Sequence, residues 1–455
     1  MTGRTLLTGW GRTAPSAAEV IVHSSRNTAA LAGSVTSMPP RGGIPRGLGR
    51  SYGDPAQNGG GVVLRLQDDA DETVVDRTSA TATVPAGVSL DDLLDVIVPS
   101  GFFVPVTPGT RFVTIGGAIA SDIHGKNHHV DGSFGSNVLR MSMMLADGSV
   151  VETSPGERPE LFWATIGGMG LTGLVLDATI RLLPIETSQL AVDTDRVPDL
   201  DTLLTTMEES DRYFRYSVAW IDPMARGAHL GRSVLTRAEH ATVDQLLPRD
   251  AVEPLAYAPG QRLRVPPIVP ARGVINHWTI KAFNEIWYRK SPRRAVGRIH
   301  SIPAFFHPLD MVGAWNRLYG RIGFLQYQLL VPFGQEAALR EVLERLAASG
   351  APSFLSVLKR FGSANPAPLS FPAPGWTLTV DVPGATRGLS ALFHTLDALV
   401  LDAGGRHYFA KDGHTTPAAI ERGYPRLTEW RATRDTVDPG GAWASDLSRR
   451  LRLTG

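Results

Sequence analysis

The sequence predicts a protein of mixed α and β structure with two domains. Its 455 residues exceed what one ordinary core holds and suit two domains or one large α/β unit. Before about Glu186, short runs of alternating apolar and polar residues lie between glycine clusters, as is typical of strands and turns. After Glu186 the chain changes to longer strands, amphipathic helices and a proline-rich stretch. We therefore place a domain boundary near Glu186.

The elements of the first part follow from local patterns. Short strands are expected within residues 62–87, followed by a helix that Ser89 and Asp92 begin and that ends before Gly101. Residues 139–145 and 149–153 predict a hairpin around Asp147-Gly148. A short helix over 161–166 and a strand over 174–182 complete this part.

The second part carries two clear helical patterns. Residues 335–348 and 389–403 place apolar side chains on one stripe, and Gly350 and Gly404-Gly405 are expected to end these helices. Residues 406–410 predict a strand and residues 442–453 a terminal helix.

Composition excludes several classes of protein. Hydrophobic residues make up 43% and charged residues 20%, which allows a packed interior and excludes wholesale disorder. The formal net charge of +1 gives no overall field for binding polyanions. Because cysteine is absent, disulfides, zinc–thiolate sites, iron–sulfur clusters and thioether-linked cofactors are excluded, and the redox compartment stays open. No apolar run is long enough to span a membrane, and no signal peptide is visible at the start.

Two glycine-rich loops could approach a ligand closely. Residues 45–54 place three glycines, two arginines and a serine in ten positions, although a plain tight loop is an equal alternative. Residues 168–173 match the dinucleotide pattern G-x-G-x-x-G. That pattern requires a strand before it and a helix after it, whereas here the expected order is reversed. We therefore reject nicotinamide binding through this motif.

The most informative block covers residues 108–129. Small residues dominate its middle, so a flat ligand could lie directly on the backbone. Three histidines, His124, His128 and His129, follow with Lys126. A metal site is the obvious rival, but adjacent histidines without a partner at helical spacing make it weak, and we expect no metal.

In this order, residues 46–54, 86–93, 108–125 and 162–168 resemble the FAD-binding domain of the vanillyl-alcohol oxidase type. Within that superfamily the chain resembles, nearly from end to end, the family of decaprenylphosphoryl-β-D-ribose 2′-epimerase flavoprotein subunits. The further matching segments are residues 8–15, 121–129, 307–311, 323–328, 367–372 and 444–446.

The resemblance implies an α+β fold of two domains. A bipartite FAD-binding domain would comprise residues 1–187 and 404–455, and an antiparallel-sheet substrate domain would comprise residues 188–403. The reaction implied is FAD-dependent oxidation of the 2-hydroxyl of a decaprenylphosphoryl-linked ribose to the ketone. An NAD(P)H-dependent short-chain reductase would then complete epimerisation to the arabinose form, for cell-wall arabinogalactan in actinobacteria.

The resemblance also implies the cofactor site. FAD would be bound non-covalently, because the histidine that matches His124 is linked to the flavin in some superfamily members but not in this family. The expected cofactor-binding residues are Arg46, Gly47, Leu48, Gly49, Arg50, Ser51, Tyr52, Gly109, Thr110, Thr114, Gly116, Gly117, Ala120, Ser121, Asp122, His124, Gly125, Asn127, Gly170, Thr172, Gly173 and Tyr408.

Removal of hydride from a carbinol needs a group that takes the hydroxyl proton and a positive charge near the flavin. Lys411 is the first catalytic candidate, with His124 and Tyr52 as the others. Strand alternation places Gln326 and Gln328 on one face. The expected substrate residues are Lys126, Trp220, Gln326, Gln328, Lys359, Phe361, Thr377 and Thr379. Thr377 and Thr379 depart from the asparagine and cysteine usual in the family, which excludes covalent inhibition through that thiol.

Residues 256–309 combine basic and apolar character. The segment holds nine basic residues and one acid, Glu285, interleaved with prolines and aromatic residues. This composition suits an anionic membrane surface or a polyprenyl phosphate, while a solvated, mobile loop is an equal alternative. No recognition motif indicates nucleic acid. We expect peripheral attachment to the plasma membrane, on the envelope side by resemblance, with the cytoplasm as the alternative.

Two other functions stay open. The first is a soluble-sugar or aldonolactone oxidase of the same superfamily, for which the basic segment would be superfluous. The second is a non-catalytic subunit that holds flavin or lipid for a partner, which Lys411, His124 and Tyr52 argue against. The electron acceptor, the polyprenyl length and the oligomeric state do not follow from the sequence.

Overall fold

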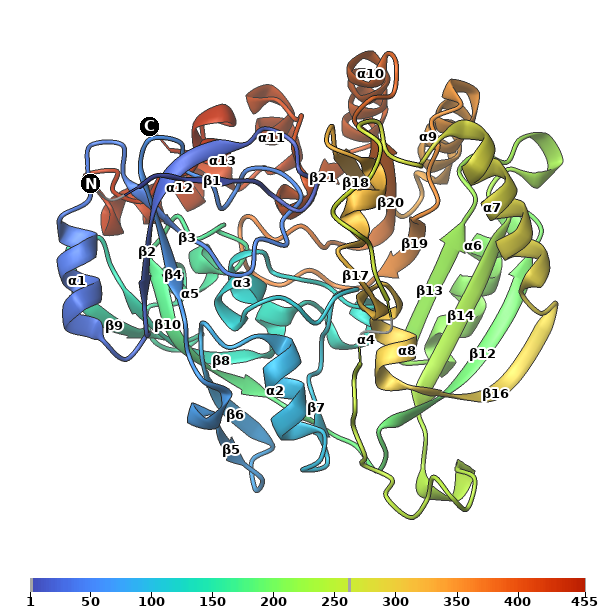
Figure 1. Cartoon of the computed structure of the whole chain (residues 1–455), viewed down its shortest axis with the longest axis horizontal. Coiled ribbons are helices and arrows are strands. Elements are labelled where there is room, and N and C mark those ends of the chain that lie inside the picture. The colour runs from blue at the N-terminus through green and yellow to red at the C-terminus, as the bar shows by residue number, and fades with distance from the viewer. Residues whose placement is uncertain (1–2, 261–262, 455) are drawn as a thin grey trace.

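The computed structural model describes residues 3–260 and 263–454 and shows two sheet-based halves side by side (Figure 1). Residues 1, 2, 261, 262 and 455 lie outside this description, and with them Arg262 of the basic segment and the ends of the expected first domain. Helices combine with large antiparallel sheets, so the expected α+β class is confirmed.

The first half contains two larger sheets and one short two-stranded sheet. One has the strand order β1-β2-β4-β3, with β2, β4 and β3 parallel and β1 antiparallel at the edge. The other is antiparallel, in the order β5-β6-β10-β8-β9. The bounds are β1 Thr5–Leu7, β2 Ser16–His23, α1 Thr28–Thr36, β3 Gly43–Pro45, β4 Val62–Leu66, β5 Val74–Asp76, β6 Thr81–Pro85, β8 Val138–Met144, β9 Val150–Thr153 and β10 Leu174–Arg181.

Short helices and loops cover these sheets. The Ser89 side chain accepts a hydrogen bond from the Asp92 backbone at the start of α2, which confirms the expected cap. The segment before the G-x-G-x-x-G motif is helix α5 and the segment after it is strand β10, so the reversed order is also confirmed. The bounds are α2 Leu90–Ile97, β7 Phe102–Phe103, α3 Ile115–Ala120, α4 His128–Asp131, α5 Pro159–Thr165 and β11 Leu183–Pro184.

The second half is an antiparallel sheet in the order β16-β12-β14-β13-β19-β20-β18-β21. Its bounds are β12 Gln189–Val197, β13 Tyr216–Ile221, β14 Ser233–His240, β16 Arg294–Ser301, β18 Phe324–Pro332, β19 Ser356–Phe361, β20 Gly375–Pro383 and β21 Arg406–His407.

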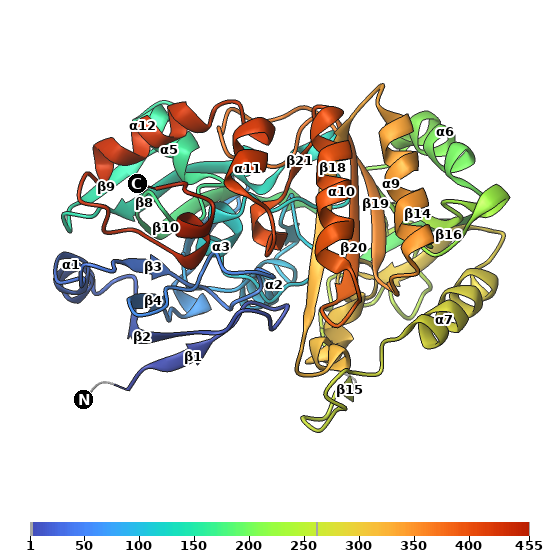
Figure 2. The same cartoon turned by 90° about the horizontal axis from the view of Figure 1, so that it is seen from above.

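Three helices cover one face of this sheet, as Figure 2 shows. They are α6 Leu200–Ser210, α9 Glu336–Ser349 and α10 Leu389–Asp402, and their apolar stripes form one buried cluster with the strands. Tyr327 and Leu329 point into this cluster, so Gln326 and Gln328 point to the opposite face, as the alternation predicts. That opposite face is turned toward the first half.

Between β14 and β18 the chain leaves the sheet and returns. This stretch contains β15 Leu263–Arg264, α7 His277–Lys290, α8 Ile302–Phe306 and β17 Val312–Gly313, so much of the basic segment is helix and strand. Among residues 3–260 and 263–454, no helix is both long and apolar enough to cross a membrane.

The C-terminal stretch returns to the first half and corrects two expectations. Helices α11 Pro417–Gly423, α12 Leu427–Val437 and α13 Asp446–Arg450 pack there. The strand expected over 406–410 is wrong beyond His407, because the Lys411 N–H bonds back to the Tyr408 carbonyl in a 3₁₀ turn. The helix expected over 442–453 covers only five residues, since Trp443 pairs with Gly43 and Ser445 caps the helix later.

Candidate active site

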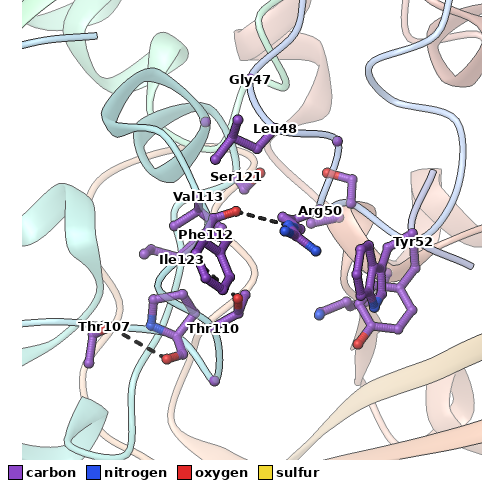
Figure 3. A pocket seen from close by; sticks show the side chains of 18 of the residues that line it. Gly47, Leu48, Arg50, Tyr52, Thr107, Thr110, Phe112, Val113, Ser121 and Ile123 are labelled. Atoms are coloured by element: carbon purple, nitrogen blue, oxygen red, sulfur yellow. Dashed lines mark hydrogen bonds between the residues drawn. The ribbon is translucent and has the colours of Figure 1, made fainter. Parts of the chain in front are cut away.

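A cavity of about 970 Å³ lies between the two halves. One wall consists of the loop 46–52 and of residues 114–121, which comprise helix α3 and its two flanking residues. We call these two segments the glycine-lined shelf. Figure 3 shows Arg50 of the first loop beside Phe112 and Val113, where its Nε donates to the Phe112 carbonyl, and Tyr52 on the other side of Arg50. The facing wall is the open side of the eight-stranded sheet, and a third wall comes from the stretch between β14 and β18.

Close approach of neighbouring side chains explains two glycines of the shelf, Gly47 and Gly49. A Cβ on Gly47 would lie 2.3 Å from the Thr114 hydroxyl, so only glycine fits between the two loops. Gly49 has a φ of +68°, which favours glycine, and Arg46 packs against it. A Cβ on Gly117 would meet only the Thr114 hydroxyl and would extend into the cavity. At Gly117 the shelf therefore presents bare backbone to the cavity, where a flat ring can lie close to it.

The structure gathers most of the expected cofactor residues on this cavity. Its lining includes Arg46, Gly47, Leu48, Gly49, Arg50, Ser51, Tyr52, Gly109, Thr110, Thr114, Gly116, Gly117, Ala120, Ser121, His124, Gly125, Gly170, Gly173 and Tyr408. The cavity is at the upper end of the range for ligand-binding sites. These observations fit FAD, whose long form needs a shelf of bare backbone and whose reduced ring needs a nearby cation.

Three expected cofactor residues lie behind the wall instead, where polar contacts occupy them. The Asp122 carboxylate accepts hydrogen bonds from Ser133, Asn365, Ser370 and the Gly135 N–H. Asn127 donates to the Pro105 carbonyl, and the Thr172 hydroxyl pairs with that of Thr165. In this structure these three residues hold the loops behind the shelf and do not line the cavity.

His124 lies at the junction of shelf and sheet. Lys359 Nζ is 3.2 Å from its Nδ1, and Gln328 Nε2 is 2.9 Å from its Nε2. Phe361 packs against the ring, with centroids 4.8 Å apart. Burial, reinforced by the Lys359 charge, lowers the pKa of His124 well below its usual value. The ring is therefore neutral near pH 7, and both of its nitrogens have partners.

The other two histidines of the block are engaged elsewhere. His128 Nδ1 accepts from the Gly362 N–H, and His129 Nε2 lies 2.9 Å from the Phe214 carbonyl. Across the described part of the chain, no group of metal-ligating side chains gathers as a metal ion requires.

Three lysines line the cavity, and burial changes the acidity of each. Burial and the charge of Lys411 lower the pKa of Lys359 to about 7. Burial and the charge of Lys359 lower that of Lys126, also to about 7, and Lys126 donates to the Phe305 carbonyl. Burial lowers the pKa of Lys411 to about 8, although Asp381 opposes this shift. Each of these ammonium groups can therefore release a proton near neutral pH.

Lys411 and Tyr52 face one another. The Lys411 Nζ lies 3.9 Å from the centroid of the Tyr52 ring, a cation–π contact. The Tyr52 N–H bonds to the Ala410 carbonyl at 2.8 Å, so the two loops also join through their backbones. Burial, and next the charge of Asp381, raise the pKa of Tyr52 well above its usual value, which keeps the phenol protonated.

A C-terminal arginine connects the loop that carries Tyr52 to the loop that carries Lys411. Arg450 in α13 pairs with Asp54 at 2.7 Å and with Asp412 at 3.0 Å. Asp54 follows Tyr52 by two residues, and Asp412 directly follows Lys411. Burial acts to raise the pKa of Asp412, but the charges of Arg450 and His414 and two backbone N–H donors together outweigh burial and lower that pKa. We call these three residues the Arg450 bridge. Sequence reasoning missed it, because its partners lie far apart along the chain.

The sheet face supplies the polar wall opposite the shelf. Of the expected substrate residues, Lys126, Trp220, Gln326, Gln328, Lys359 and Thr379 line the cavity. Phe361 and Thr377 do not. Phe361 is buried behind the His124 ring, and the Thr377 hydroxyl donates to the Leu329 carbonyl and accepts from Gln328.

Asp381 is a further polar group on this face that sequence reasoning missed. It pairs with Gln326 across β18 and β20, and Gln326 donates to its carboxylate. Burial raises its pKa to about 7. Continuing the alternation of Thr377 and Thr379 by two residues would have found it.

Comparison with known proteins agrees with this geometry. The FAD binding domain family matches residues 41–154, which include the shelf. The chain is 45% identical to decaprenylphosphoryl-beta-D-ribose oxidase of Mycolicibacterium smegmatis over 98% of this chain and 97% of that protein. It is 25% identical to alditol oxidase of a Streptomyces species, over 89% of both chains. It is 30% identical to mouse L-gulonolactone oxidase over 31% of this chain and 32% of that protein.

The FAD binding domain match and the near-complete alignment with the mycobacterial oxidase agree with the shelf, the lysines and the cavity between them. The chain belongs to the decaprenylphosphoryl-β-D-ribose oxidase family of FAD-dependent oxidoreductases.

Proposed function

We propose that the protein oxidises the 2-hydroxyl of decaprenylphosphoryl-β-D-ribose to the 2-keto product, the first half of epimerisation to the arabinose form. The observation that carries this proposal is a single cavity in which the glycine-lined shelf faces Lys359, Lys411 and Gln328. Its support is the similarity of the whole chain to an oxidase of that name. Bound FAD supplies the acceptor for the hydride that leaves carbon 2.

In this proposal Lys411 takes the hydroxyl proton. Its pKa of about 8 leaves a fraction of the amine neutral near pH 7, so it can accept a proton and pass it to solvent. Tyr52 stays protonated and orients Lys411 through its ring. His124 is neutral with both nitrogens bonded, so it positions Lys359 and Gln328.

The substrate's sugar would lie against the polar sheet face. Lys126, Gln326, Gln328, Lys359 and Thr379 offer hydrogen bonds there, and Trp220 offers a flat apolar wall. The Trp220 indole N–H donates to the Phe354 carbonyl, which holds the ring in place. The buried Phe361 and Thr377 would act through His124 and Gln328.

FAD is proposed to bind without a covalent link. A bond from His124 to the flavin would have to replace one of its two nitrogen contacts. We expect acid precipitation of the yellow protein to release all flavin into the supernatant, as an absorbance spectrum of the two fractions measures. Colour retained in the pellet would contradict this.

The domain division is proposed as residues 1–187 with 404–455 for FAD and 188–403 for substrate. In its support, α11, α12 and α13 pack on the first half. Strand β21 is an exception, because it extends the eight-stranded sheet beside β18.

The reaction also implies partners. A 2-keto sugar must be reduced to complete epimerisation, so we propose an NAD(P)H-dependent short-chain reductase as partner, in cell-wall arabinan synthesis. The exposed apolar and basic side chains of α7 support peripheral contact with an anionic membrane. The envelope side of the membrane is proposed from the family resemblance alone.

Anaerobic mixing tests the function. We expect decaprenylphosphoryl-β-D-ribose to bleach the flavin absorbance, and free ribose and alditols to leave it unchanged. Bleaching by alditols instead would favour the second candidate, a soluble-sugar oxidase, which the likeness to alditol oxidase suggests. No bleaching by any sugar would indicate a non-catalytic flavin-binding subunit.

A further inference from the structure

Two aromatic side chains of α7 belong both to the cavity wall and to the outer surface. Phe283 and Trp287 line the cavity, yet they are 40% and 45% exposed. They stand one helical turn apart with rings stacked, centroids 6.0 Å apart and planes at 15°. Figure 2 shows α7 at the outside of the molecule, away from α6, α9 and α10. The cavity therefore reaches the surface along this face of α7.

The cavity wall stays apolar from α7 inward. The Phe283 ring packs edge-on against Phe354, with centroids 5.9 Å apart. The same wall is completed by the apolar residues Leu309, Met311, Val312, Trp315 and Leu355. This apolar wall is larger than the area that a ribose ring could cover. None of its side chains forms a hydrogen bond with Lys411, His124 or Tyr52.

Cations accompany this apolar path at its outer end. Arg264 lines the cavity beside it, and Lys281, Arg289 and Lys290 are exposed on α7. Glu285, the one acid that sequence analysis finds in this segment, is already paired with Arg232 and Arg289. The uncompensated charge along α7 is therefore positive, which suits a phosphate at the cavity and anionic lipid outside it.

We propose that Phe283 and Trp287 form the binding subsite for the isoprene units that follow those on the inner wall, so that the polyprenyl chain leaves the cavity across α7. This inference rests on the proposed function and adds where the lipid binds. A wall of aromatic and aliphatic side chains can bury a prenyl chain but adds little to the binding of a free sugar. The subsite would thus confer the preference for a lipid-linked sugar over a free one.

A chain-length series tests the subsite in the holoenzyme. The probes are phosphoryl-β-D-ribose carrying ten isoprene units and the same head group carrying two. We expect F283S/W287S to lower kcat/KM for the ten-unit substrate by about tenfold or more, because the variant removes two apolar contacts. Activity with the two-unit substrate, which reaches less of the wall, should fall by about threefold or less.

Two further variants control for folding and for general hydrophobicity. F283L/W287L keeps an apolar wall and should retain most of the chain-length preference. W278S alters an exposed tryptophan of the same helix that does not line the cavity, and both substrates should react as with the unaltered protein. An equal fall for both substrates in F283S/W287S, or no fall for either, would overturn the subsite.

Binding of decaprenyl phosphate separates failure of the subsite from failure of the proposed function. This lipid lacks the sugar, and its binding in detergent micelles can be followed by quenching of tryptophan fluorescence with W287F as reference. Suppose that no prenylphosphoryl ribose bleaches the flavin, but that decaprenyl phosphate binds F283S/W287S about tenfold more weakly than it binds W287F. The subsite is then supported and the assigned reaction is wrong. Equal binding to both proteins would overturn the subsite alone.

Discussion

The lysines at the inner and outer ends of the cavity differ in their exposure to water and therefore in their acidity. Inside, Lys126, Lys359 and Lys411 are only partly exposed, and burial lowers the pKa of each toward neutrality. Outside, Lys281 and Lys290 of α7 are exposed to water beside bare aromatic rings. The comparison shows how one residue type serves two purposes. Burial makes lysine a group that exchanges protons, and exposure makes it a fixed charge for a lipid surface.

The largest effect is expected at Lys411. Replacing it with alanine (K411A) removes the proposed proton acceptor, and general-base catalysis contributes about 10²–10⁴-fold. We expect the rate of anaerobic flavin reduction to fall by about that factor, as stopped-flow absorbance measures. K411R keeps the cation over Tyr52 but cannot release a proton near neutral pH. It should therefore bind FAD normally and still lose most of the rate, whereas rescue by arginine would mean that only the charge matters.

The Arg450 bridge should give the next largest effect. Replacing Arg450 with methionine (R450M) leaves the carboxylate of Asp412 buried without its cation, which costs about 3 kcal/mol of unfolding free energy. Urea unfolding followed by fluorescence measures this loss. The folded-state pKa of Asp412 lies below its usual 3.8, so its stabilising contribution is present above about pH 4 and is lost as the pH falls.

The pH dependence of the stability loss in R450M distinguishes an ion pair from packing of the Arg450 side chain. The stability difference between R450M and the unaltered protein should shrink below about pH 4, because protonated Asp412 no longer needs a cation. A difference that stays constant with pH would show that Arg450 contributes through its aliphatic stem alone. A bridge that also positions Lys411 should lower kcat in R450M more than it changes KM.

A third prediction concerns the pH profile of the reaction. A lysine must lose its proton to act as a base, and the pKa of Lys411 is about 8. We expect kcat/KM to rise about tenfold per pH unit below that pKa and to level off above it. D381N removes the carboxylate that raises the pKa of Lys411. The midpoint should therefore move to lower pH in this variant, and an unmoved midpoint would assign the profile to another group.

The sequence predicts the glycine-lined shelf and the polar sheet face better than it predicts the Arg450 bridge. Glycines at 47, 49, 116 and 117 carry a local signal, because a missing side chain is visible in the sequence itself. Gln326 and Gln328 follow from period-two alternation in one strand. The Arg450 bridge has no such signal, since Asp54 and Arg450 are 396 residues apart and meet only after the C-terminal stretch returns.

The errors share a physical cause. Asp122, Asn127 and Thr172 sit in motifs of the right composition, but composition does not tell which polar side chain faces a ligand and which faces the loop behind it. The composition of residues 442–453 likewise did not predict that α13 has only five residues. The Trp443 N–H donates to Asp438 and Trp443 pairs with Gly43, so the helix begins after Trp443. In each of these cases the outcome depends on which groups meet in the folded chain, from Thr165 seven residues before Thr172 to Gly43, which is 400 residues before Trp443.

The smallest effect is expected at the exposed lysines. Each basic side chain near an anionic bilayer contributes about 1 kcal/mol, and salt screens this attraction. We expect K281A/K290A to bind vesicles of phosphatidylglycerol and phosphatidylcholine about 30-fold more weakly in a sedimentation assay at low salt, and nearly like the unaltered protein in 1 M salt. W278S should weaken binding at both salt concentrations, because it removes an apolar contact that salt does not screen. Flavin reduction by the two-unit substrate should be the same in all three proteins, since neither Trp278 nor the two lysines lines the cavity. A membrane affinity that K281A/K290A leaves unchanged at low salt would show that α7 meets the bilayer through its aromatic residues alone.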